Sequence, residues 1–356
     1  MKRSVYILCG LLILLAACEK KVDHPTQGQP IYLSAALSGS AETKVPFVGT
    51  APDESNPLEV AVWASTTDNV FLNTDNNGSD GTVAIHTAAS FRDSGPQLLR
   101  GVVYPSSQVQ GGEAPAVHFV AMHPQDSWNT DDGTKAMFTF NGSQDVMFAS
   151  QVSGAYDTDG QPAAKVLDLG FEHLLTRITI QMGAELKDGD ELTDVLDVWG
   201  RIKHLEIQEA DRKIRDKVLI DLSKGEDFDF DNDIEFAESG SLAALPFYGL
   251  DSDEVFPGES WYELTEAIDS VAYVMCPPVN LGDGAEYVIN FETENKGQQS
   301  LELDLEKTAS SQDGTGSTRG CHYLVTLKFK RGRAITPEVE VIEWENGGYG
   351  TGYIED

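Results

Sequence analysis

The chain has 356 residues, and its 58 acidic side chains outnumber the 25 basic ones to give a formal net charge of −33. A surface this acidic excludes binding to nucleic acid or to anionic lipid through general charge. Hydrophobic residues make up 40% of the chain, which excludes a disordered protein, and the length favours two domains over one.

The N-terminus has the pattern of a lipoprotein signal peptide. Lys2 and Arg3 precede an almost wholly apolar run, which ends in the lipobox sequence Leu15-Ala16-Ala17-Cys18. The run is far shorter than the ~20 residues that a membrane-spanning helix needs, so residues 1–17 are predicted to be removed. Cys18 then becomes the lipid-bearing first residue and anchors the protein in the outer membrane through its acyl chains. The alternative is an ordinary secretory signal that is followed by a chance cysteine.

Beyond a polar, proline-containing stretch at residues 18–30, which is predicted to be a flexible tether, the main signal is alternation of apolar and polar side chains. Leu301, Leu303 and Leu305 alternate with acidic residues, which gives a strand one dry face and one wet face. Helical periodicity is confined to Glu191–Val198. The predicted strands, in chain order, are Ile31–Ser38, Leu58–Ala64, Gln97–Tyr104, Ala116–Met122, Lys165–Met182, Ile202–Gln208, Lys217–Leu222, Ser270–Met275, Glu286–Glu292, Leu301–Leu305, Tyr323–Phe329 and Pro337–Trp344.

Many short strands separated by turn-rich stretches predict an all-β protein. So many strands fit two tandem β-sandwiches better than one. The join is placed at the charged, glycine-containing turn Lys187–Asp190. This divides the chain into an N-terminal sandwich at residues 31–187 and a C-terminal sandwich at residues 188–356.

The cysteines leave one question open. Cys9 is lost with the signal peptide and Cys18 takes the lipid, so only Cys276 and Cys321 remain to pair. One alternative is a disulfide, which adds about 4 kcal/mol of stability in the chain-entropy description. The other is two buried thiols on separate strands.

No catalytic constellation is recognisable, so an enzyme is not predicted and no cofactor is indicated. His173 and His204 lie in strand-like runs, without a nucleophile or metal partner at a known spacing. Cys321 and His322 are adjacent, and neighbouring side chains of a strand point to opposite faces, so these two cannot form a nucleophile–base pair with each other. The glycine-rich run at residues 314–320 has neither the spacing of a phosphate loop nor a following helix, and is predicted to be a hairpin loop.

Four acidic residues have a spacing that is typical of calcium loops. Asp227, Asp229, Asp231 and Glu238 occupy positions 1, 3, 5 and 12 of an EF-hand-like loop. The position that needs glycine for its sharp turn holds Asn232, and flanking helices are not predicted. No metal site is therefore predicted, and the four residues are kept only as weak calcium candidates. The alternatives are an edge strand or an acidic loop in which the rings of Phe228 and Phe230 are buried.

A sugar-stacking platform among the five tryptophans is best sought at Trp128, which lies in a polar loop. Aromatic residues at strand positions, such as Trp63 and Trp344, are more often part of the core.

Several features, in their order along the chain, resemble the fimbrillin family, the Mfa-like group of exported lipoproteins. They are the lipobox at Cys18, the first strand followed by Ala41-Glu42-Thr43-Lys44, the phrases Val117–Pro124 and Gln144–Ala149, and the phrase Leu169–Ile178 followed by a closing strand to Trp344.

The resemblance implies two transthyretin-like β-sandwich domains and a subunit of a type V pilus that is assembled from lipoprotein precursors. In that family a trypsin-like protease cuts after a basic residue that follows the first strand. A neighbour's C-terminal strand then fills the groove that the lost strand leaves. Lys44 is the candidate processing site here, and Ile31–Leu37 is the removable strand. The implied partners are other fimbrillin subunits, the outer membrane through the Cys18 lipid, and a host or glycan ligand.

One departure from the family pattern and one feature of the C-terminus favour a minor, tip or anchor subunit over a stalk subunit. Lys44 stands where arginine is commoner, and Gly347–Asp356 contains four glycines, which makes a poor donor strand. The rival interpretation is a monomeric surface glycan-binding lipoprotein that is built from the same sandwiches.

Overall fold

The computed structural model confirms an all-β protein. It describes residues 28–37, 57–65, 71, 84–91, 97–105, 116–126, 128–130, 134–155, 166–250, 254–280, 286–305, 317–332, 335 and 337–342. The predicted signal peptide, Cys18, most of the tether, Lys44 and residues 343–356 lie outside these ranges. No helix among the described residues is long and apolar enough to cross a membrane.

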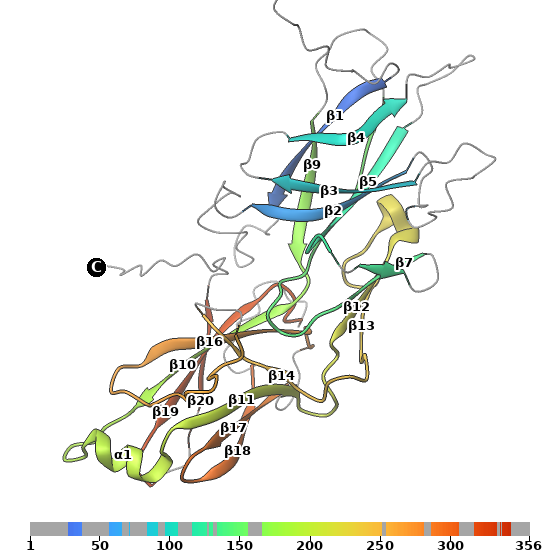
Figure 1. Ribbon diagram of the computed structural model, residues 1–356. Coiled ribbons are helices and arrows are strands. Elements are labelled where there is room, and N and C mark those ends of the chain that lie inside the picture. The colour runs from blue at the N-terminus through green and yellow to red at the C-terminus, as the bar shows by residue number, and fades with distance from the viewer. Residues whose placement is uncertain are drawn as a thin grey trace, which may run out of the picture.

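A seven-stranded sheet forms one end of the elongated molecule (Figure 1). Its strand order is β3-β2-β5-β8-β9-β1-β4, and all its pairs are antiparallel except that of β1 with β9. The outer strands β3 and β4 also contact each other, so the sheet curls around its own interior. The strands are β1 (Gly28–Leu37), β2 (Leu58–Ser65), β3 (Ala84–Phe91), β4 (Gln97–Pro105), β5 (Ala116–His123), β8 (Met147–Ala155) and β9 (Val166–His173).

One apolar cluster fills this curled sheet, and every strand of the sheet contributes to it. Alternate side chains of each strand point inward, which is what a two-residue period dictates. Burying one such aliphatic side chain stabilises the fold by about 1.5–3 kcal/mol. The cluster consists of Ile31, Leu33, Leu58, Val60, Val62, Ala64, Phe91, Leu99, Val117, Phe119, Ala121, Met147, Ala149, Leu167, Leu169 and Phe171.

Two facing sheets form a sandwich at the other end of the molecule (Figure 1). Their buried faces belong to the second apolar cluster, and β17 alternates strictly between buried and half-buried residues. The five-stranded sheet has the order β15-β16-β10-β19-β20, with β10 (Thr176–Ala184), β15 (Tyr248–Gly249), β16 (Asp269–Cys276), β19 (His322–Phe329) and β20 (Pro337–Ile342). The four-stranded sheet has the order β14-β11-β17-β18, with β11 (Ile202–Glu209), β14 (Leu245–Pro246), β17 (Tyr287–Thr293) and β18 (Gly297–Leu303).

A predicted helix is confirmed as α1 (Leu192–Trp199), which caps the far end of the sandwich (Figure 1). Glu191 and Asp194 form a capping box at its first turn. The indole N–H of Trp199 donates to the Lys330 carbonyl at 2.9 Å, and its ring meets that of Phe329 edge to face. These contacts hold the helix against the sheets.

A third, small sheet links the two halves along one side of the molecule (Figure 1). Here β7, which precedes the last strand of the seven-stranded sheet in the chain, pairs with β12, which follows the first strand of the sandwich. The apolar cluster of the sandwich continues past this sheet to the outer face of the seven-stranded sheet, where it includes Trp63, Met122 and Phe148. The small sheet has the order β13-β12-β7-β6, with β6 (Asn129–Thr130), β7 (Lys135–Thr139), β12 (Lys217–Asp221) and β13 (Ile234–Ala237), and the short 3₁₀ segment η1 (Leu222–Asp227) follows β12.

The prediction of one long strand over Lys165–Met182 is wrong. The chain leaves the seven-stranded sheet at His173 and enters the five-stranded sheet at Thr176. Leu174 and Leu175 are both fully buried, which breaks the alternation of a single strand. The division of the chain at residues 187 and 188 stays a prediction, because a sheet and an apolar cluster connect the two halves.

Candidate functional site

The first site of interest is the position of β1 within the seven-stranded sheet. β1 lies between two strands: it pairs in parallel with β9, from Tyr32 opposite Val166 to Leu37 opposite Phe171, and antiparallel with β4. Ile31 and Leu33 are almost completely buried in the interior cluster. The first described strand of the chain is therefore an interior strand, and its position is flanked by backbone donors and acceptors on both sides.

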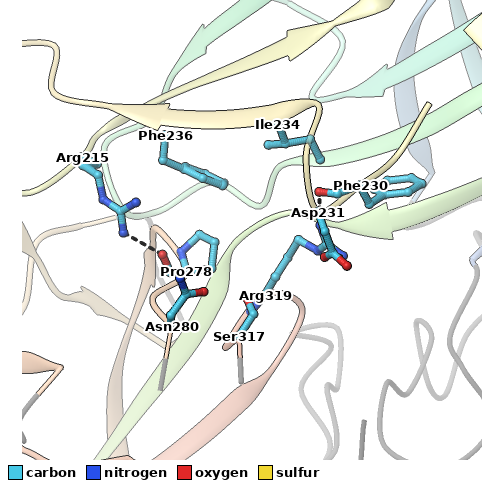
Figure 2. A pocket seen from close by; sticks show the side chains of 9 residues that line it. All are labelled: Arg215, Phe230, Asp231, Ile234, Phe236, Pro278, Asn280, Ser317 and Arg319. Atoms are coloured by element: carbon cyan, nitrogen blue, oxygen red, sulfur yellow. Dashed lines mark hydrogen bonds and ion pairs between the residues drawn. The ribbon is translucent and has the colours of Figure 1, made fainter. Parts of the chain in front are cut away.

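The second site is a cavity of about 390 Å³ between β13 and the ends of the sandwich loops (Figure 2). Figure 2 shows Phe236 and Ile234 on one side, Pro278 opposite them, and two arginines that approach from different directions. Ile234 and Phe236 are two residues apart on β13, so they share one face of that strand. The lining residues are Arg215, Phe230, Asp231, Ile234, Phe236, Pro278, Asn280, Ser317 and Arg319.

Arg215 is held in a buried ion pair behind the cavity. Its Nε donates to the two carboxylate oxygens of Glu209 at 3.0 and 2.9 Å, and its Nη2 lies 2.8 Å from Oε2. The Glu209 side chain is only 2% exposed, so its charge needs compensation, which comes mainly from this guanidinium and also from Nε of Arg212 at 3.6 Å. Nη2 also donates to the Pro278 carbonyl at 2.7 Å, which fixes Arg215 against the opposite wall (Figure 2).

Arg319 is held in a different way, at the mouth of the cavity. Its Nη2 lies 2.9 Å from Oδ1 of Asp231, whose side chain is 58% exposed. Its Nη1 donates to the Phe230 carbonyl, and the guanidinium lies 5.5 Å from the centre of the Phe230 ring. Each of the two cavity arginines therefore has its own carboxylate partner.

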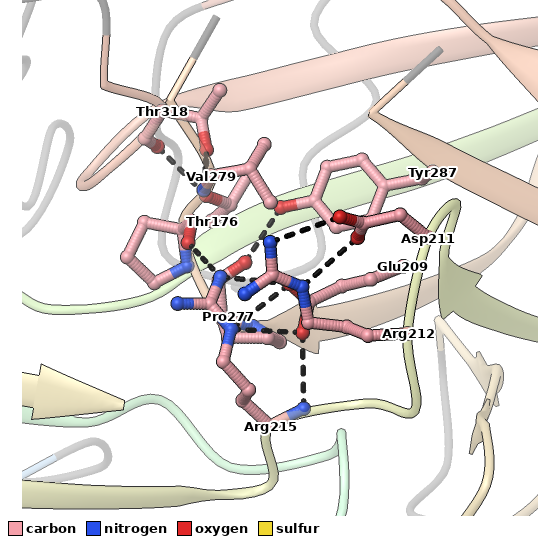
Figure 3. Close-up of polar contacts among 10 residues, drawn as sticks. Thr176, Glu209, Asp211, Arg212, Arg215, Pro277, Val279, Tyr287 and Thr318 are labelled. Atoms are coloured by element: carbon pink, nitrogen blue, oxygen red, sulfur yellow. Dashed lines mark hydrogen bonds and ion pairs between the residues drawn. The ribbon is translucent and has the colours of Figure 1, made fainter. Parts of the chain in front are cut away.

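A buried polar network fixes the loops beneath the cavity (Figure 3). Thr318 accepts a hydrogen bond from the Val279 backbone N–H through its hydroxyl, and the Thr176 hydroxyl donates to the Thr318 carbonyl. The Tyr287 hydroxyl donates to the Pro277 carbonyl at 2.6 Å. The segments that carry Pro278, Asn280 and Ser317 are therefore tied to strands of both sheets, which gives the cavity a fixed shape.

The four weak calcium candidates do not converge on one point. Asp231 pairs with Arg319, and Asp229 accepts from the Asp231 backbone N–H at 2.9 Å and from the Asn232 amide at 2.6 Å. The first of these bonds is the main cause of the lowered pKa of Asp229. In the part of the chain that the structure describes, no three His, Cys, Asp or Glu side chains, Asp227 and Glu238 included, gather as metal ligands.

The phenylalanines between these aspartates lie in a loop and not in an edge strand. Phe228 and Phe230 are partly buried and pack on Phe148, with ring centres at 4.8 and 5.9 Å. The acidic stretch is thus a loop that is anchored by its aromatic rings to the outer face of the seven-stranded sheet.

Cys276 and Cys321 do not form a disulfide in the structure. Cys276 is fully buried, and its thiol donates to the Thr176 carbonyl. Burial raises the pKa of this thiol to about 12. The structure therefore has two thiols and no disulfide between them, but Cys321 is only partly buried and precedes β19, so the alternative of two buried thiols on separate strands is confirmed in part.

The histidines and Trp128 also find partners. His173 lies 2.6 Å from the Asp145 carboxylate, and His204 lies 2.9 Å from Glu206. Trp128 donates its indole N–H to the Pro124 carbonyl, and its ring packs 5.1 Å from that of Phe138. Trp128 is thus a partly buried side chain that is packed on the core.

The sequence did not indicate the cavity, although Asp231 was a calcium candidate and Ser317 and Arg319 lie in the glycine-rich run that was predicted to be a hairpin loop. Its walls come from four segments, around residues 215, 230–236, 278–280 and 317–319. The available signal was indirect: arginine is scarce in an acidic chain, and two of the few arginines line one cavity.

No protein-family model matches the chain, and no curated protein matches its sequence. Among solved structures, a candidate cell adhesion protein of Bacteroides uniformis is 17% identical, with a TM-score of 0.47 over 89% of this chain and 99% of that one. A fimbrial protein of Bacteroides vulgatus is 12% identical, with a TM-score of 0.48 over 89% and 99%. A candidate adhesin of Bacteroides ovatus is 9% identical, with a TM-score of 0.48 over 93% and 99%. Likenesses this distant carry no argument about function.

Proposed function

We propose that this chain is a non-enzymatic structural or adhesive subunit of surface fimbriae, which is exported as an outer-membrane lipoprotein and assembles by strand exchange. The observation that carries the proposal is the place of β1. It is the first described strand, yet it lies between β4 and β9 in the interior of its sheet.

Loss of β1 would leave a slot that favours a replacement strand. The backbone groups of β4 and β9 that now pair with β1 would lose their partners. Leu99, Leu167 and Leu169 would lose the cover of Ile31 and Leu33 in the shared cluster. Exposing each large aliphatic side chain costs about 1.5–3 kcal/mol, so a strand with alternating apolar residues stabilises the open subunit.

In this proposal Cys18 carries the lipid during export, and cleavage after Lys44 releases the lipid together with β1. The C-terminal strand of a neighbouring subunit then enters between β4 and β9. A subunit that is not cut keeps β1 and its anchor, and terminates or anchors the fibre.

The test is limited digestion of the full-length protein with trypsin, with Lys44→Gln as the matched control. We expect one early cut after Lys44, followed by a ladder of oligomers that resist mild denaturant. Lys44→Gln should lack that cut and remain monomeric. A product that is cut after Lys44 but stays strictly monomeric would contradict strand exchange.

A synthetic peptide of residues 28–37 adds a second readout. It should refill the slot of the cut protein and suppress the ladder, because it restores the pairs with β4 and β9. The same peptide with aspartate in place of Ile31 and Leu33 is the control and should have no effect, since both side chains must enter the apolar cluster.

A further inference from the structure

The cavity beside β13 has a balance of charge that defines the ligands it can accept. Arg215 is neutralised by Glu209, and Arg319 is neutralised by Asp231. Asn280 and Ser317 add uncharged polar groups. An anionic or cationic ligand would therefore bring a charge for which the described walls hold no unpaired counter-charge, and burying such a charge is costly.

The walls combine apolar surface with polar groups. Ile234 and Phe236 project from one face of β13, and Pro278 lies opposite them (Figure 2). Hydrogen-bonding groups stand around this apolar slot: the exposed Asn280 amide, the Ser317 hydroxyl, and the Asp231 carboxylate at the mouth. A volume of about 390 Å³ falls within the range of roughly 300–1,000 Å³ that is usual for small-molecule sites.

We propose that this cavity binds one residue of a neutral sugar. A pyranose ring has apolar C–H faces and a rim of uncharged hydroxyls, which matches an apolar slot that is surrounded by amide, hydroxyl and carboxylate groups. The ring lies between Phe236 and Pro278, and its hydroxyls bond with Asn280, Ser317 and Asp231. The open mouth at Asp231 lets the rest of a glycan chain continue into solvent.

This site does not depend on strand exchange. None of its lining residues belongs to β1, β4 or β9, so the ligand can bind whether or not the chain assembles. The polar network beneath the cavity holds its loops in place before any ligand arrives, which lowers the entropic cost of binding.

The test is saturation-transfer NMR on the full chain with single sugars as probes. Glucose, galactose, mannose, fucose, xylose and N-acetylglucosamine are the neutral probes, and glucuronic acid and sialic acid are the charged ones. We expect transfer to at least one neutral sugar, together with a shift of the Ile234 methyl resonance. Transfer to the charged sugars alone, or to none of the probes, would overturn the proposal.

Variants locate the binding. Phe236→Ala should weaken the affinity at least tenfold, since it removes the stacking surface, and Asn280→Ala should weaken it about threefold to tenfold through one lost hydrogen bond. Gln298→Ala, an equally exposed amide on β18, is the control and should bind as the unmodified chain does. If Phe236→Ala fails to fold, Asn280→Ala decides alone. Undiminished affinity in that folded variant would overturn the site.

Discussion

The hydroxyl of Ser34 donates a hydrogen bond to the carboxylate of Asp168, across the parallel pair of β1 and β9. The two residues are 134 positions apart in the chain and opposite each other in the register of the strands. This bond links β1, the first described strand, to β9 within the seven-stranded sheet.

The two faces of β1 should contribute unequally to stability. Leu33→Ala creates a cavity in the apolar cluster and should lower the free energy of unfolding by about 2–5 kcal/mol. Ser34→Ala loses one hydrogen bond and should cost about 0.5–1.5 kcal/mol. Urea unfolding of both variants checks the order, and equal losses would show that β1 is not held by its buried face.

The buried pair of Arg215 and Glu209 should behave as a unit. Arg215→Met leaves a carboxylate that is 2% exposed with only the half-exposed Arg212, 3.6 Å away, as a cationic partner, so we expect a loss of up to about 3–5 kcal/mol. Adding Glu209→Gln to Arg215→Met should recover part of that loss, because no uncompensated charge then remains. A double-mutant cycle from denaturant unfolding measures the coupling, and a simple sum of the two single effects would contradict it.

His123 should make the fold sensitive to mild acid. Burial lowers the pKa of His123 from 6.5, although Asp145 and the Glu59 carbonyl, at 2.8 Å from Nδ1, act in the opposite direction. The unfolded state therefore takes up a proton at a higher pH than the native state does. The stability that neutral His123 contributes is complete above pH 6.5. It is lost as the pH falls from there through the lowered pKa of the native state, by at most about 1.4 kcal/mol per pH unit.

The measurement is the free energy of unfolding between pH 7.5 and 5 for the unmodified chain and for His123→Gln, at about half-unit steps. The glutamine amide can still donate to the Glu59 carbonyl, so the variant should show a flatter profile in this range. Identical profiles would mean that His123 has the same pKa in the native and unfolded states, which would contradict the prediction.

Thiol labelling should show that Cys276 is unreactive in the native protein and reactive in the unfolded chain. With a pKa raised to about 12 by burial, this thiol holds almost no thiolate at pH 8 and should not react with iodoacetamide in the native protein. Unfolding in urea without reductant should make both Cys276 and Cys321 reactive, since they form no disulfide. Labelling of the unfolded chain only after reduction would instead establish a bridge.

The sequence predicted best those strands that have one wet face. β17 alternates between buried and half-buried residues throughout and β19 does so from Tyr323 on, and both were expected within a residue or two of their observed ends. β8 was missed as a strand, because its first three residues are all buried. Met147 points into one apolar cluster and Phe148 into the other, so a two-residue period cannot be seen there.

Local sequence patterns could not predict which strands pair when those strands are far apart in the chain. The pairing of β7 with β12 joins Lys135 to Asp221, and nothing near either strand in the sequence indicates the partner. The cavity is a result of such pairings, since β13 is placed beside it by its pairing with β12. The arginines of the cavity are visible in the sequence, but the sequence does not indicate which carboxylates they pair with.

The most direct test of strand exchange is a cysteine pair in place of Ser34 and Asp168. These side chains already touch across β1 and β9, so Ser34→Cys with Asp168→Cys should form a disulfide that keeps β1 in its slot. After cleavage following Lys44, the oxidised variant should remain monomeric. Reductant should release β1 and restore the oligomer ladder, while Ser34→Cys alone should form the ladder under both conditions. Equal ladders from the oxidised and reduced double variant would contradict assembly through the β1 slot.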